Sequence, residues 1–566
     1  MNILGITSGS ESGACLFQHG QIALAVSEER LTRKKFDDAF PARSIAWILQ
    51  ESGLVCSDID LICYGFSQEF ADSDAEQAYI DRLLATETVT DETSLAIIRQ
   101  RIDTERQIDN SKRQAFFAAI RDLFPDTPIY NCSHHQSHQA AAFAPSPFAR
   151  ALVVTADGRG DFKSLTISRA DRSNGIEELY ASPSWRSLGY FYGRITHLCG
   201  FTANRHEGKV TGLAALGDPH VAQDLIGQII RLEHEVICPA FGELYTPFFS
   251  NYSAALTEQA AHFKRDDLAA AGQQQLENIV CRLVEKYAQA TGLRQVCLAG
   301  GVFANVKLNQ KIRQLDCIDE VFVYPAMSDG GICAGSVYHY LLVNKQAIPE
   351  IQQVFLGPNC DLANSRAEIQ QRGISALVEI NAIDRLINLL EQQSVVGLIE
   401  GRGEFGPRAL GHRSIIASAF DRGITERINQ KLQRDDFMPF APSIAIDFAE
   451  RCLENYQASC LSANFMTLSF PVKAEFAANS PAAIHVDNTV RPQIVTPDTN
   501  PFFYELLVAW QRQTGGLCLL NTSFNIHEEP IVNSVDDVIR ALEHDAVDLV
   551  FTPPNLFLTS SPKAYS

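Results

Sequence analysis

Hydrophobic runs near the start of the chain alternate with short polar turns. Asn2–Thr7 is an apolar run rich in β-favouring residues, and the small polar residues of Ser8–Gly13 follow it. Ala14–Phe17 and Gln21–Val26 then flank the dipeptide His19-Gly20. This order predicts a strand, a turn and a β-hairpin.

The same order of features recurs further along the chain. Ala151–Thr155 is apolar, Asp157–Asp161 is rich in glycine and acidic residues, and Leu165–Ile167 is apolar again. We therefore predict a strand, a turn and a strand here as well. The repetition indicates an internally duplicated α/β domain.

Longer patterns fill much of the sequence between and after these segments. Helical periodicity covers Glu92–Phe124 and Gln273–Thr291, whereas Gln295–Ala299 and Glu320–Tyr324 are typical of short buried strands ahead of glycine turns. Strands that alternate with helices predict an α/β architecture.

A domain boundary is predicted close to residue 350. Asn344–Gln353 is polar, and a new helix (Ala382–Gln392) and a new buried strand (Val395–Glu400) follow it. Domains are usually separated by such polar segments. The chain is therefore expected to divide into a first domain, 1–350, and a second domain, 351–566.

Composition narrows the class of protein. The 566 residues are 46% hydrophobic and 20% charged, as in ordinary soluble domains. No apolar run is long enough to cross a membrane, and the start lacks the features of a signal peptide. The 14 cysteines include no CxxC pair, which favours reduced thiols. We predict a cytoplasmic protein.

The formal net charge of −20 bears on the partners of the protein. Such a charge opposes binding to nucleic-acid phosphates or to anionic membranes. We therefore expect neither a nucleic acid nor a membrane as a partner. Local basic clusters in so acidic a chain become candidate sites for small anions.

Two histidines and two aspartates form a candidate metal site. His134 and His138 are four residues apart and would share one face of a helix. Asp157 and Asp329 stand where strands should give way to glycine turns, at the strand ends where α/β sites form. This donor set suits a divalent Fe, Zn or Mn ion acting as a Lewis acid. Capping or core histidines and Asx turns are the structural alternatives.

The stretch 402–434 contains seven basic residues against three acidic ones, which indicates an anion site or, alternatively, a solvated basic helix face. Gly401–Gly406 matches GxGxxG, but the basic Arg408 and Arg413 replace the apolar face that a dinucleotide-binding helix needs. We therefore reject a dinucleotide fold. No GxxxxGK[ST] segment occurs, so an ATP site here would not be a P-loop.

Several ordered motifs together resemble the O-carbamoyltransferase family, which includes enzymes of the nodulation protein U and the tobramycin and cephamycin carbamoyltransferase type. The similarity runs over nearly the whole chain. The motifs that carry it are Glu28-Glu29-Arg30 with Lys35, His134–His138, Gly208–Ala214, Gly300-Gly301-Val302, Glu404–Gly411, Pro439–Pro442 and Leu520–Asn525.

The resemblance implies a duplicated actin/hexokinase-like (ASKHA) domain followed by a YrdC-like α/β domain. It implies that the second domain makes carbamoyl adenylate from carbamoyl phosphate and ATP. The first domain would then transfer the carbamoyl group to a hydroxyl of a small natural product. The implied cofactors are ATP, Mg²⁺ and Fe²⁺ or another divalent ion at the His/Asp site.

Roles carry over by motif. The implied metal ligands are His134, His138, Asp157 and Asp329, and the implied catalytic residues are His134, His138, Asp329 and Lys35. The implied nucleotide-binding residues are Lys209, Gly300, Gly301, Asn305 and Asp157. The implied carbamoyl phosphate-binding residues are Arg408, Arg491, Asn521 and Ser523.

The chain also departs from the family pattern. Ser10-Glu11 replaces a His-Asp pair, and Phe36 replaces a histidine, so either Glu11 or His135 would have to act as the general base or the acceptor is unusual. Leu432 and Met438 replace a lysine and an arginine, which makes Arg434 a further candidate for the phosphate grip.

Two other functions remain open. A tRNA-directed carbamoyl-type transferase is disfavoured by the charge of −20. A catalytically weakened nucleotide-binding regulatory protein is suggested by Ser10, Phe36 and Leu432 but disfavoured by the retained histidines. The sequence leaves the acceptor unidentified, does not exclude an amine acceptor, and leaves the oligomeric state open, with a homodimer among the options.

Overall fold

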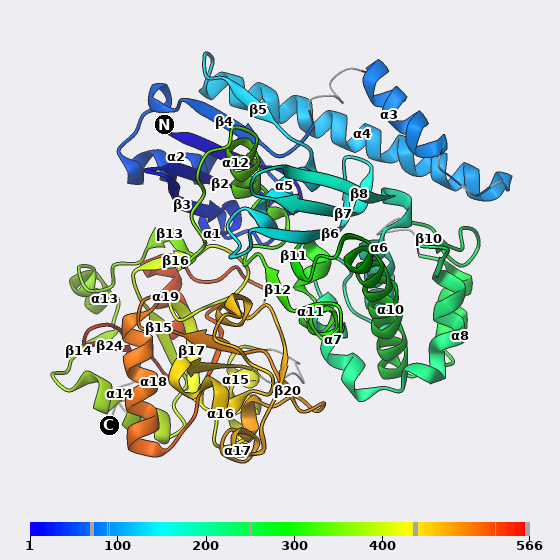
Figure 1. Cartoon of the computed structure of the whole chain (residues 1–566). Coiled ribbons are helices and arrows are strands. Elements are labelled where there is room, and N and C mark those ends of the chain that lie inside the picture. Colours follow the sequence, from blue (N-terminus) through cyan, green and yellow to red (C-terminus); the bar gives the residue numbers. More distant parts are fainter. Residues whose placement is uncertain are drawn as a thin grey trace. The chain divides into compact units, whose positions relative to one another are not determined.

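The computed structural model describes residues 1–67, 73–85, 87, 89, 91–247, 252–433, 440–526 and 528–560. The chain forms two compact units (Figure 1). The first unit contains Met1–Ala23 and Asp38–Glu350, and the second contains Leu24–Asp37 and Ile351–Ser566. The short segment Leu24–Asp37 is thus grouped with residues that follow it by more than 300 positions.

The first unit begins with a five-stranded sheet whose strand order is β3-β2-β1-β4-β5. Strand β1 pairs with β2 antiparallel and with β4 parallel, and β4 pairs with β5 parallel. The strands are β1 (Ile3–Thr7), β2 (Gly13–Gln18), β3 (Gln21–Ser27), β4 (Leu61–Tyr64) and β5 (Ile129–Asn131).

A second five-stranded sheet in this unit has the order β12-β11-β6-β7-β8. Its strands are β6 (Arg150–Gly160), β7 (Lys163–Asp171), β8 (Gly175–Pro183), β11 (Gln295–Ala299) and β12 (Glu320–Val323). Strands β6, β7 and β8 are joined as antiparallel hairpins, while β6, β11 and β12 run parallel. Both sheets therefore share one connectivity, as the repeat in the sequence predicted.

One predicted element in the second sheet is wrong. The predicted turn at Asp157–Asp161 lies mostly within β6, which continues to Gly160. The pairing of β6 with β7 shifts register between Ala156 and Gly160, which is the mark of a β-bulge or similar irregularity. Bulges re-aim side chains beside functional sites, and Asp157 lies inside this one.

Helices α5 (His134–Phe143) and α12 (Ile332–Val343) pack on each other. Helix α5 also contacts β6 and β11, and α12 contacts β1, β2 and β4. The two helices lie so close that a Cβ atom on Gly335 would stand 2.2 Å from the carbonyl oxygen of Ser137. This close packing fixes the end of α5 that carries the histidines relative to the turn before α12.

Further elements complete the first unit. Helix α4 confirms the long predicted helix, and α10 begins eight residues before its predicted start. These elements are α2 (Ala42–Ser52), α3 (Ser73–Ala85), α4 (Glu92–Leu123), α6 (Leu188–Leu198), α7 (Glu207–Leu213), α8 (Pro219–Ile229), β9 (Ile230–Glu233), β10 (Val236–Pro239), α9 (Ala254–Ala260), α10 (Arg265–Thr291) and α11 (Val306–Arg313).

The second unit is built on an eight-stranded mixed sheet with the order β14-β24-β23-β15-β17-β22-β18-β21. Its strands are β14 (Ser375–Val378), β15 (Val396–Ile399), β17 (Arg413–Ser418), β18 (Ala441–Ala445), β21 (Gln493–Val495), β22 (Leu519–Ser523), β23 (Leu549–Thr552) and β24 (Leu556–Thr559). Two separate two-stranded sheets pair β13 (Phe355–Asn359) with β16 (Arg402–Glu404) and β19 (Phe470–Pro471) with β20 (Thr489–Val490). Its helices are α1 (Glu28–Thr32), α13 (Arg366–Gln371), α14 (Ala382–Glu391), α15 (Gly423–Lys431), α16 (Ile446–Cys452), α17 (Ala474–Asn479), α18 (Pro501–Thr514) and α19 (Val535–Glu543).

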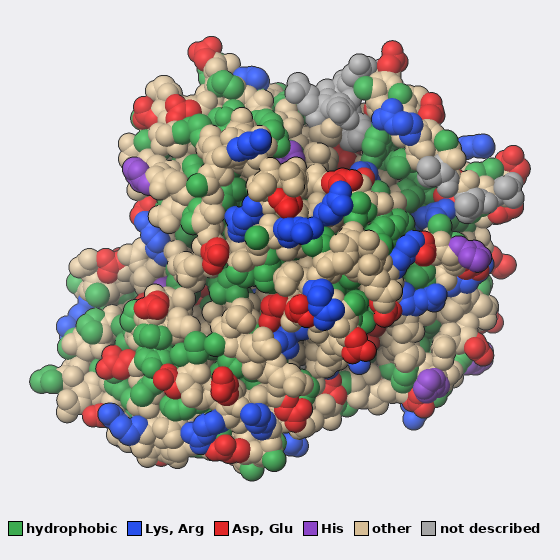
Figure 2. Space-filling model, in the orientation of Figure 1, with side chains coloured by type: hydrophobic (Ala, Val, Ile, Leu, Met, Phe, Trp, Pro, Cys, Tyr) green, Lys and Arg blue, Asp and Glu red, His purple; other side chains and the backbone are tan. Residues whose placement is uncertain are grey.

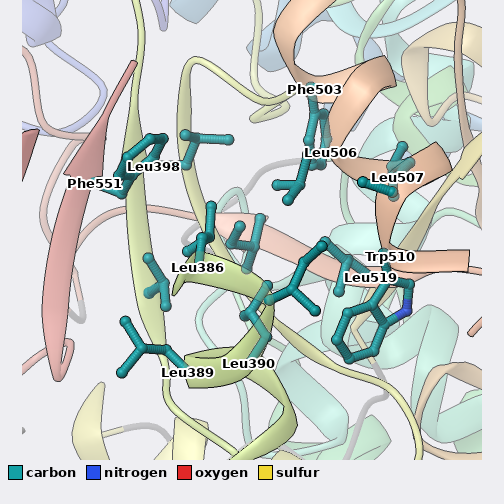
Figure 3. Packing of buried hydrophobic residues seen from close by; sticks show 14 of the residues in the cluster. Leu386, Leu389, Leu390, Leu398, Phe503, Leu506, Leu507, Trp510, Leu519 and Phe551 are labelled. Atoms are coloured by element: carbon teal, nitrogen blue, oxygen red, sulfur yellow. The ribbon is translucent and has the colours of Figure 1, made fainter. Parts of the chain in front are cut away.

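Helices α14 and α18 bury their apolar faces against this sheet (Figure 3). Leu386 and Leu390 of α14 meet Leu506 and Trp510 of α18 in one cluster with Leu519 of β22. Each fully buried leucine contributes about 1.5–3 kcal/mol of hydrophobic stabilisation. The cluster therefore fixes β22, whose far end carries the residues Asn521 and Ser523.

No helix in the described part of the chain is both long and apolar enough to span a membrane.

Candidate metal centre and anion site

Helix α5 begins with a capping box. Ser133 Oγ accepts from the backbone N–H of Gln136 at 3.2 Å, and Gln136 Oε1 accepts from the backbone N–H of Ser133 at 2.9 Å. Such reciprocal bonds fix the first helical residue, here His134. His134 and His138 then stack one turn apart, with ring centroids separated by 4.7 Å.

The structure brings the four predicted metal ligands together. One ligand atom from each of His134, His138, Asp157 and Asp329 lies within 4.8 Å of the others. His138 Nε2 is 3.1 Å from Asp157 Oδ2, and His134 Nε2 is 3.7 Å from Asp329 Oδ1. Both imidazoles are buried.

The donor set fits a divalent metal ion. Both ring nitrogens of His134 and the Oδ1 atom of Asp329 are buried and have no hydrogen-bond partner among the described residues. Buried polar atoms normally have partners, so three such atoms in one cluster call for a ligand. Two imidazoles and two carboxylates suit Fe²⁺, Zn²⁺ or Mn²⁺.

The electrostatics of the cluster are strongly coupled. Burial disfavours a charge on His138, but the nearby carboxylates of Asp157 and Asp329, 3.1 and 3.7 Å from Nε2, outweigh burial and raise its pKa to about 9. Burial also opposes ionisation of Asp157, yet His134 and His138 hold the pKa of that carboxyl well below its usual range. Without a metal ion, the cluster retains a proton that a cation would displace.

Two glycines let the chain approach this cluster. A Cβ atom on Gly160 would lie 2.1 Å from Cγ of the His134 ring, and one on Gly9 would lie 2.7 Å from Asp329 Oδ2. A larger residue at either position would displace a predicted ligand.

Ser10 and Glu11 support the turn that carries Asp329. The Oγ atom and the backbone N–H of Ser10 donate to Asp329 Oδ2 at 3.0 and 3.3 Å. Glu11 Oε2 accepts from the backbone N–H of Gly330 at 3.2 Å and from the hydroxyl of Ser328. The carboxylate that the sequence suggested as a base is therefore occupied in orienting this turn.

His135, the other candidate base, faces the sheet. Its Nδ1 atom is 2.7 Å from Thr155 Oγ1, and burial lowers the pKa of the imidazole well below its usual value. One helical turn later, Gln139 Nε2 donates to Thr166 Oγ1 and Ser168 Oγ at 2.9 and 3.0 Å. His135 and Gln139 thus lock the rotation of α5 on strands β6 and β7, which aims His134 and His138 at the aspartates.

The predicted nucleotide-binding residues include a glycine turn after strand β11 and a lysine on helix α7. Gly300 adopts φ +103°, donates to the carbonyl oxygen of Met327 at 2.7 Å, and together with Gly301 follows strand β11. Lys209 lies on α7, with Nζ 5.9 Å from the centroid of the Phe201 ring.

Asn305 is engaged within the protein. Its Oδ1 atom caps α11 by accepting from the backbone N–H of Leu308 at 3.1 Å. Its amide also exchanges hydrogen bonds with the amide of Gln273, at 2.7 and 3.2 Å. A role of Asn305 at a nucleotide would therefore act through the placement of α11.

Within the second unit, Arg408 and Arg491 lie on two segments joined by a hydrogen bond from Gln493 Nε2 to the carbonyl oxygen of Leu410 at 2.7 Å. Burial lowers the pKa of Arg408 to about 10, and burial together with the charge of Arg408 lowers the pKa of Arg491. The Nε atom of Arg491 has no hydrogen-bond partner among the described residues. Arginine forks that are withdrawn from solvent and brought to one place suit a phosphate or acyl phosphate, which would satisfy their donors.

The loop that carries Arg408 is folded around one carboxylate. Glu404 Oε1 accepts from the backbone N–H groups of Leu410, His412 and Arg413 at 2.7, 3.0 and 3.2 Å. The signal for this role was present in the Glu404–Gly411 motif, but the sequence analysis missed it.

The other residues of the basic stretch have different partners. Lys431 pairs with Asp545 and Asp548 at 2.8 and 2.9 Å, and Arg427 pairs with Asp548 at 2.8 Å. Arg413 is buried and donates only to backbone carbonyls in the contacts resolved. Leu432 is fully buried. The seven-residue basic cluster is therefore not one anion site.

Arg434, a candidate for the phosphate grip, and Met438, which stands where the family pattern has an arginine, lie outside the described residues. Asn521 and Ser523 lie on β22, where Ser523 Oγ donates to Asn525 Oδ1 at 2.6 Å. Lys35 lies on the segment Leu24–Asp37 of the second unit, between Arg33 and Phe36, which both adopt positive φ.

Comparison with known proteins gives two family matches. A model described as the carbamoyltransferase N-terminus matches residues 2–338, and one described as the carbamoyltransferase C-terminus matches residues 387–558. Nodulation protein NolNO of Sinorhizobium fredii is 32% identical over 98% of this chain and 80% of its own length. An uncharacterized protein of Methanocaldococcus jannaschii is 31% identical over 95% of this chain and 96% of its own.

Among solved structures, HypF of T. kodakarensis aligns with 61% of this chain and 48% of its own, at 11% identity and a TM-score of 0.35. A TM-score of that size does not establish a shared fold.

Proposed function

The chain belongs to the carbamoyltransferase family, and we propose that it is an ATP-dependent O-carbamoyltransferase. The second unit makes carbamoyl adenylate from carbamoyl phosphate and ATP. The first unit transfers the carbamoyl group to a hydroxyl of a small natural product. The observation that carries this proposal is the presence of two chemically different sites, the His/Asp cluster in one unit and the Arg408–Arg491 pair in the other.

The fold of each unit supports this division. Two sheets of identical connectivity, with α5 and α12 packed between them, suit a duplicated actin/hexokinase-like domain. The mixed eight-stranded sheet of the second unit suits a YrdC-like domain. We propose 1–350 and 351–566 as the two functional domains, with Leu24–Asp37 serving the second.

Activation requires a balanced reaction. Water releases inorganic phosphate from carbamoyl phosphate and leaves carbamate, whose oxygen attacks the α-phosphorus of ATP. The bond from that phosphorus to the β-phosphate oxygen breaks, and pyrophosphate leaves. Arg408 and Arg491 bind the phosphate oxygens, and Asn521 and Ser523 orient the acyl group, with Mg²⁺ accompanying ATP. Arg434 is a further candidate for the phosphate.

Transfer takes place at the first unit. The acceptor oxygen attacks the carbamoyl carbon, the bond to the AMP oxygen breaks, and AMP leaves. Lys209 and the Gly300-Gly301 turn bind the nucleotide, with Asn305 fixing α11 beside them. A divalent ion held by His134, His138, Asp157 and Asp329, with Fe²⁺ as our first choice, supplies charge stabilisation. Glu11 orients Asp329.

A small-molecule acceptor is favoured over tRNA. On the face shown in Figure 2, acidic and basic side chains are interspersed without a continuous basic surface. The formal charge of −20 also opposes a polyanionic partner. The convergence of all four metal ligands disfavours a weakened regulatory protein.

The activation step can be tested without knowing the acceptor. Carbamoyl phosphate-dependent exchange of labelled pyrophosphate into ATP is expected for the wild type and is expected to be lost in Arg491→Ala. Arg427→Ala is the matched control, since Arg427 pairs with Asp548 at the surface of the same unit. Absence of exchange in a well-folded wild type, or full exchange in Arg491→Ala, would contradict the proposal.

A further inference from the structure

The side-chain amide of Asn521 is hydrogen-bonded through its nitrogen but not through its oxygen among the described residues. The residue is 1% exposed, and its Nδ2 group donates to Gln493 Oε1 at 2.8 Å and to Ser443 Oγ at 3.1 Å. Its Oδ1 atom is buried and has no hydrogen-bond partner among the described residues. A buried acceptor of this kind is suited to a donor on a ligand.

A backbone carbonyl determines which way this amide points. Gln493 Nε2 donates to the carbonyl oxygen of Leu410 at 2.7 Å. Because a carbonyl can only accept, the nitrogen end of the Gln493 amide must face Leu410 and the oxygen end must face Ser443 and Asn521. Ser443 Oγ donates to that oxygen at 2.7 Å.

The orientation then passes to Asn521. Gln493 Oε1 can only accept, so Asn521 must turn its NH₂ group toward it. The Oδ1 atom is left at the opposite end of the amide, away from Gln493. The reverse orientation would place two carbonyl oxygens against each other.

This network is joined to both arginines of the anion site. Leu410 lies two residues after Arg408, and Gln493 lies two residues after Arg491. The bond between Gln493 and Leu410 therefore ties the two arginine-bearing segments to each other and to Asn521. Arg408 and Arg491 therefore lie on two segments that this one hydrogen bond joins.

We propose that Gln493 is a specificity-determining positioning residue, which holds Asn521 so that Oδ1 accepts a hydrogen bond from the NH₂ group of the carbamoyl substrate. The site thereby selects acyl phosphates that carry an N–H donor. This inference rests on the proposed activation of carbamoyl phosphate in the second unit.

The informative competitor is acetyl phosphate, in which a methyl group of similar size replaces NH₂. Shape alone separates the two poorly, whereas a buried acceptor left without its donor penalises the acetyl group. A single lost bond of this kind corresponds to a preference of about 10- to 100-fold for carbamoyl phosphate.

The test is pyrophosphate exchange into ATP with carbamoyl phosphate or acetyl phosphate, and the readout is the ratio of the two kcat/KM values. Wild type is expected to prefer carbamoyl phosphate by about 10- to 100-fold. Gln493→Leu should lower that ratio about 10-fold, since the Asn521 amide can then rotate and exchange the positions of its oxygen and its nitrogen. If Gln493 acts through Asn521, the double variant Gln493→Leu/Asn521→Leu has the ratio of Asn521→Leu alone.

Asn500→Ala is the matched control for general damage. Asn500 is 2% exposed and caps α18 by accepting from the backbone N–H of Phe503 at 3.0 Å. Its loss should affect both acyl phosphates equally and leave the ratio unchanged. A second measurement needs no variant: the inhibition by acetyl phosphate of carbamoyl phosphate-dependent exchange in the wild-type protein.

The outcomes separate the inference from the function beneath it. Exchange with carbamoyl phosphate but no preference over acetyl phosphate, or an unchanged ratio in folded Gln493→Leu, overturns the role of Gln493 and leaves the proposed function standing. No exchange with either compound in wild type overturns both.

Discussion

Arg30 Nη2 donates to the carbonyl oxygen of Gly406 at 3.0 Å, although 376 residues separate the two in sequence. Arg33, on the same short segment, donates to the carbonyl oxygens of Pro530 and Ile531 at 2.7 Å each. The segment Leu24–Asp37 is thus built into the second unit. Gly406 lies two residues before Arg408, so Arg30 braces the loop that carries one arginine of the proposed anion site.

Loosening this brace should weaken the binding of carbamoyl phosphate. In Arg30→Gln, the shorter side chain no longer reaches the carbonyl oxygen of Gly406, so the loop that carries Arg408 is held less firmly. The KM for carbamoyl phosphate in pyrophosphate exchange should therefore rise about 10-fold. The KM for ATP serves as the internal comparison. Arg451→Gln, which removes an exposed ion pair with Glu475, is the control and should leave both values unchanged. An unaltered KM for carbamoyl phosphate in Arg30→Gln would contradict the role of Arg30 in bracing the loop that carries Arg408.

Metal content tests the His/Asp cluster directly. We expect about one bound divalent ion per chain in wild type and close to none in His138→Ala or Asp329→Asn, because each variant removes a ligand. Elemental analysis after purification and after reloading a chelated sample measures this. His220→Ala alters an imidazole on α8 outside the cluster and should retain the ion. Equal metal content in wild type and His138→Ala would show that the cluster does not hold it.

Glu11 is predicted to affect metal affinity more than the fold. Glu11→Gln keeps the size of the side chain but weakens the bonds to Ser328 and Gly330 that hold the Asp329 turn. The dissociation constant for the metal should rise about 10- to 100-fold, as for other residues that orient a ligand. Metal titration and a thermal unfolding scan measure the two properties separately. A general base would instead give a variant with normal metal affinity and lost transfer.

Stability should respond to pH through Glu400. Burial raises the pKa of Glu400 to about 7, and Arg413 only partly offsets this. In the folded protein the Glu400 carboxyl keeps its proton up to about pH 7, whereas in the unfolded chain it loses that proton near pH 4.5. The stability that this bound proton gives the folded state is therefore complete below pH 4.5 and is lost as the pH rises through about 7. Glu400→Gln removes the dependence.

The corresponding measurement compares melting temperatures of wild type and Glu400→Gln at pH 5 and pH 8, which lie on either side of the folded-state pKa of about 7. Relative to wild type, the variant should gain stability at the higher pH. A constant difference between the two proteins at both pH values would rule out titration of Glu400 in this range.

That His134, His138, Asp157 and Asp329 lie together could be predicted from the sequence, because the signals are local. The spacing of His134 and His138 needs only a helix, and the capping box of Ser133 and Gln136 supplies its start. Asp157 and Asp329 were selected as predicted strand ends near glycines, although Asp157 lies within β6. The strand irregularity at Asp157 could not be predicted, since it depends on the pairing of β6 with β7.

The surroundings of the proposed anion site could be predicted less completely, because they are defined by tertiary contacts. Sequence alone could not reveal that Lys431 and Arg427 pair with Asp548. It also gave no signal for Gln493, whose role depends on the carbonyl of Leu410. Hydrogen bonds between distant segments leave no periodicity in the chain.

The central claim is that activation and transfer occupy different units, and pyrophosphate exchange in three proteins tests it most directly. Carbamoyl phosphate-dependent exchange should be present in wild type, lost in Arg491→Ala and retained in His138→Ala, because only Arg491 belongs to the activating site. Retained exchange in Arg491→Ala together with its loss in His138→Ala would contradict the account.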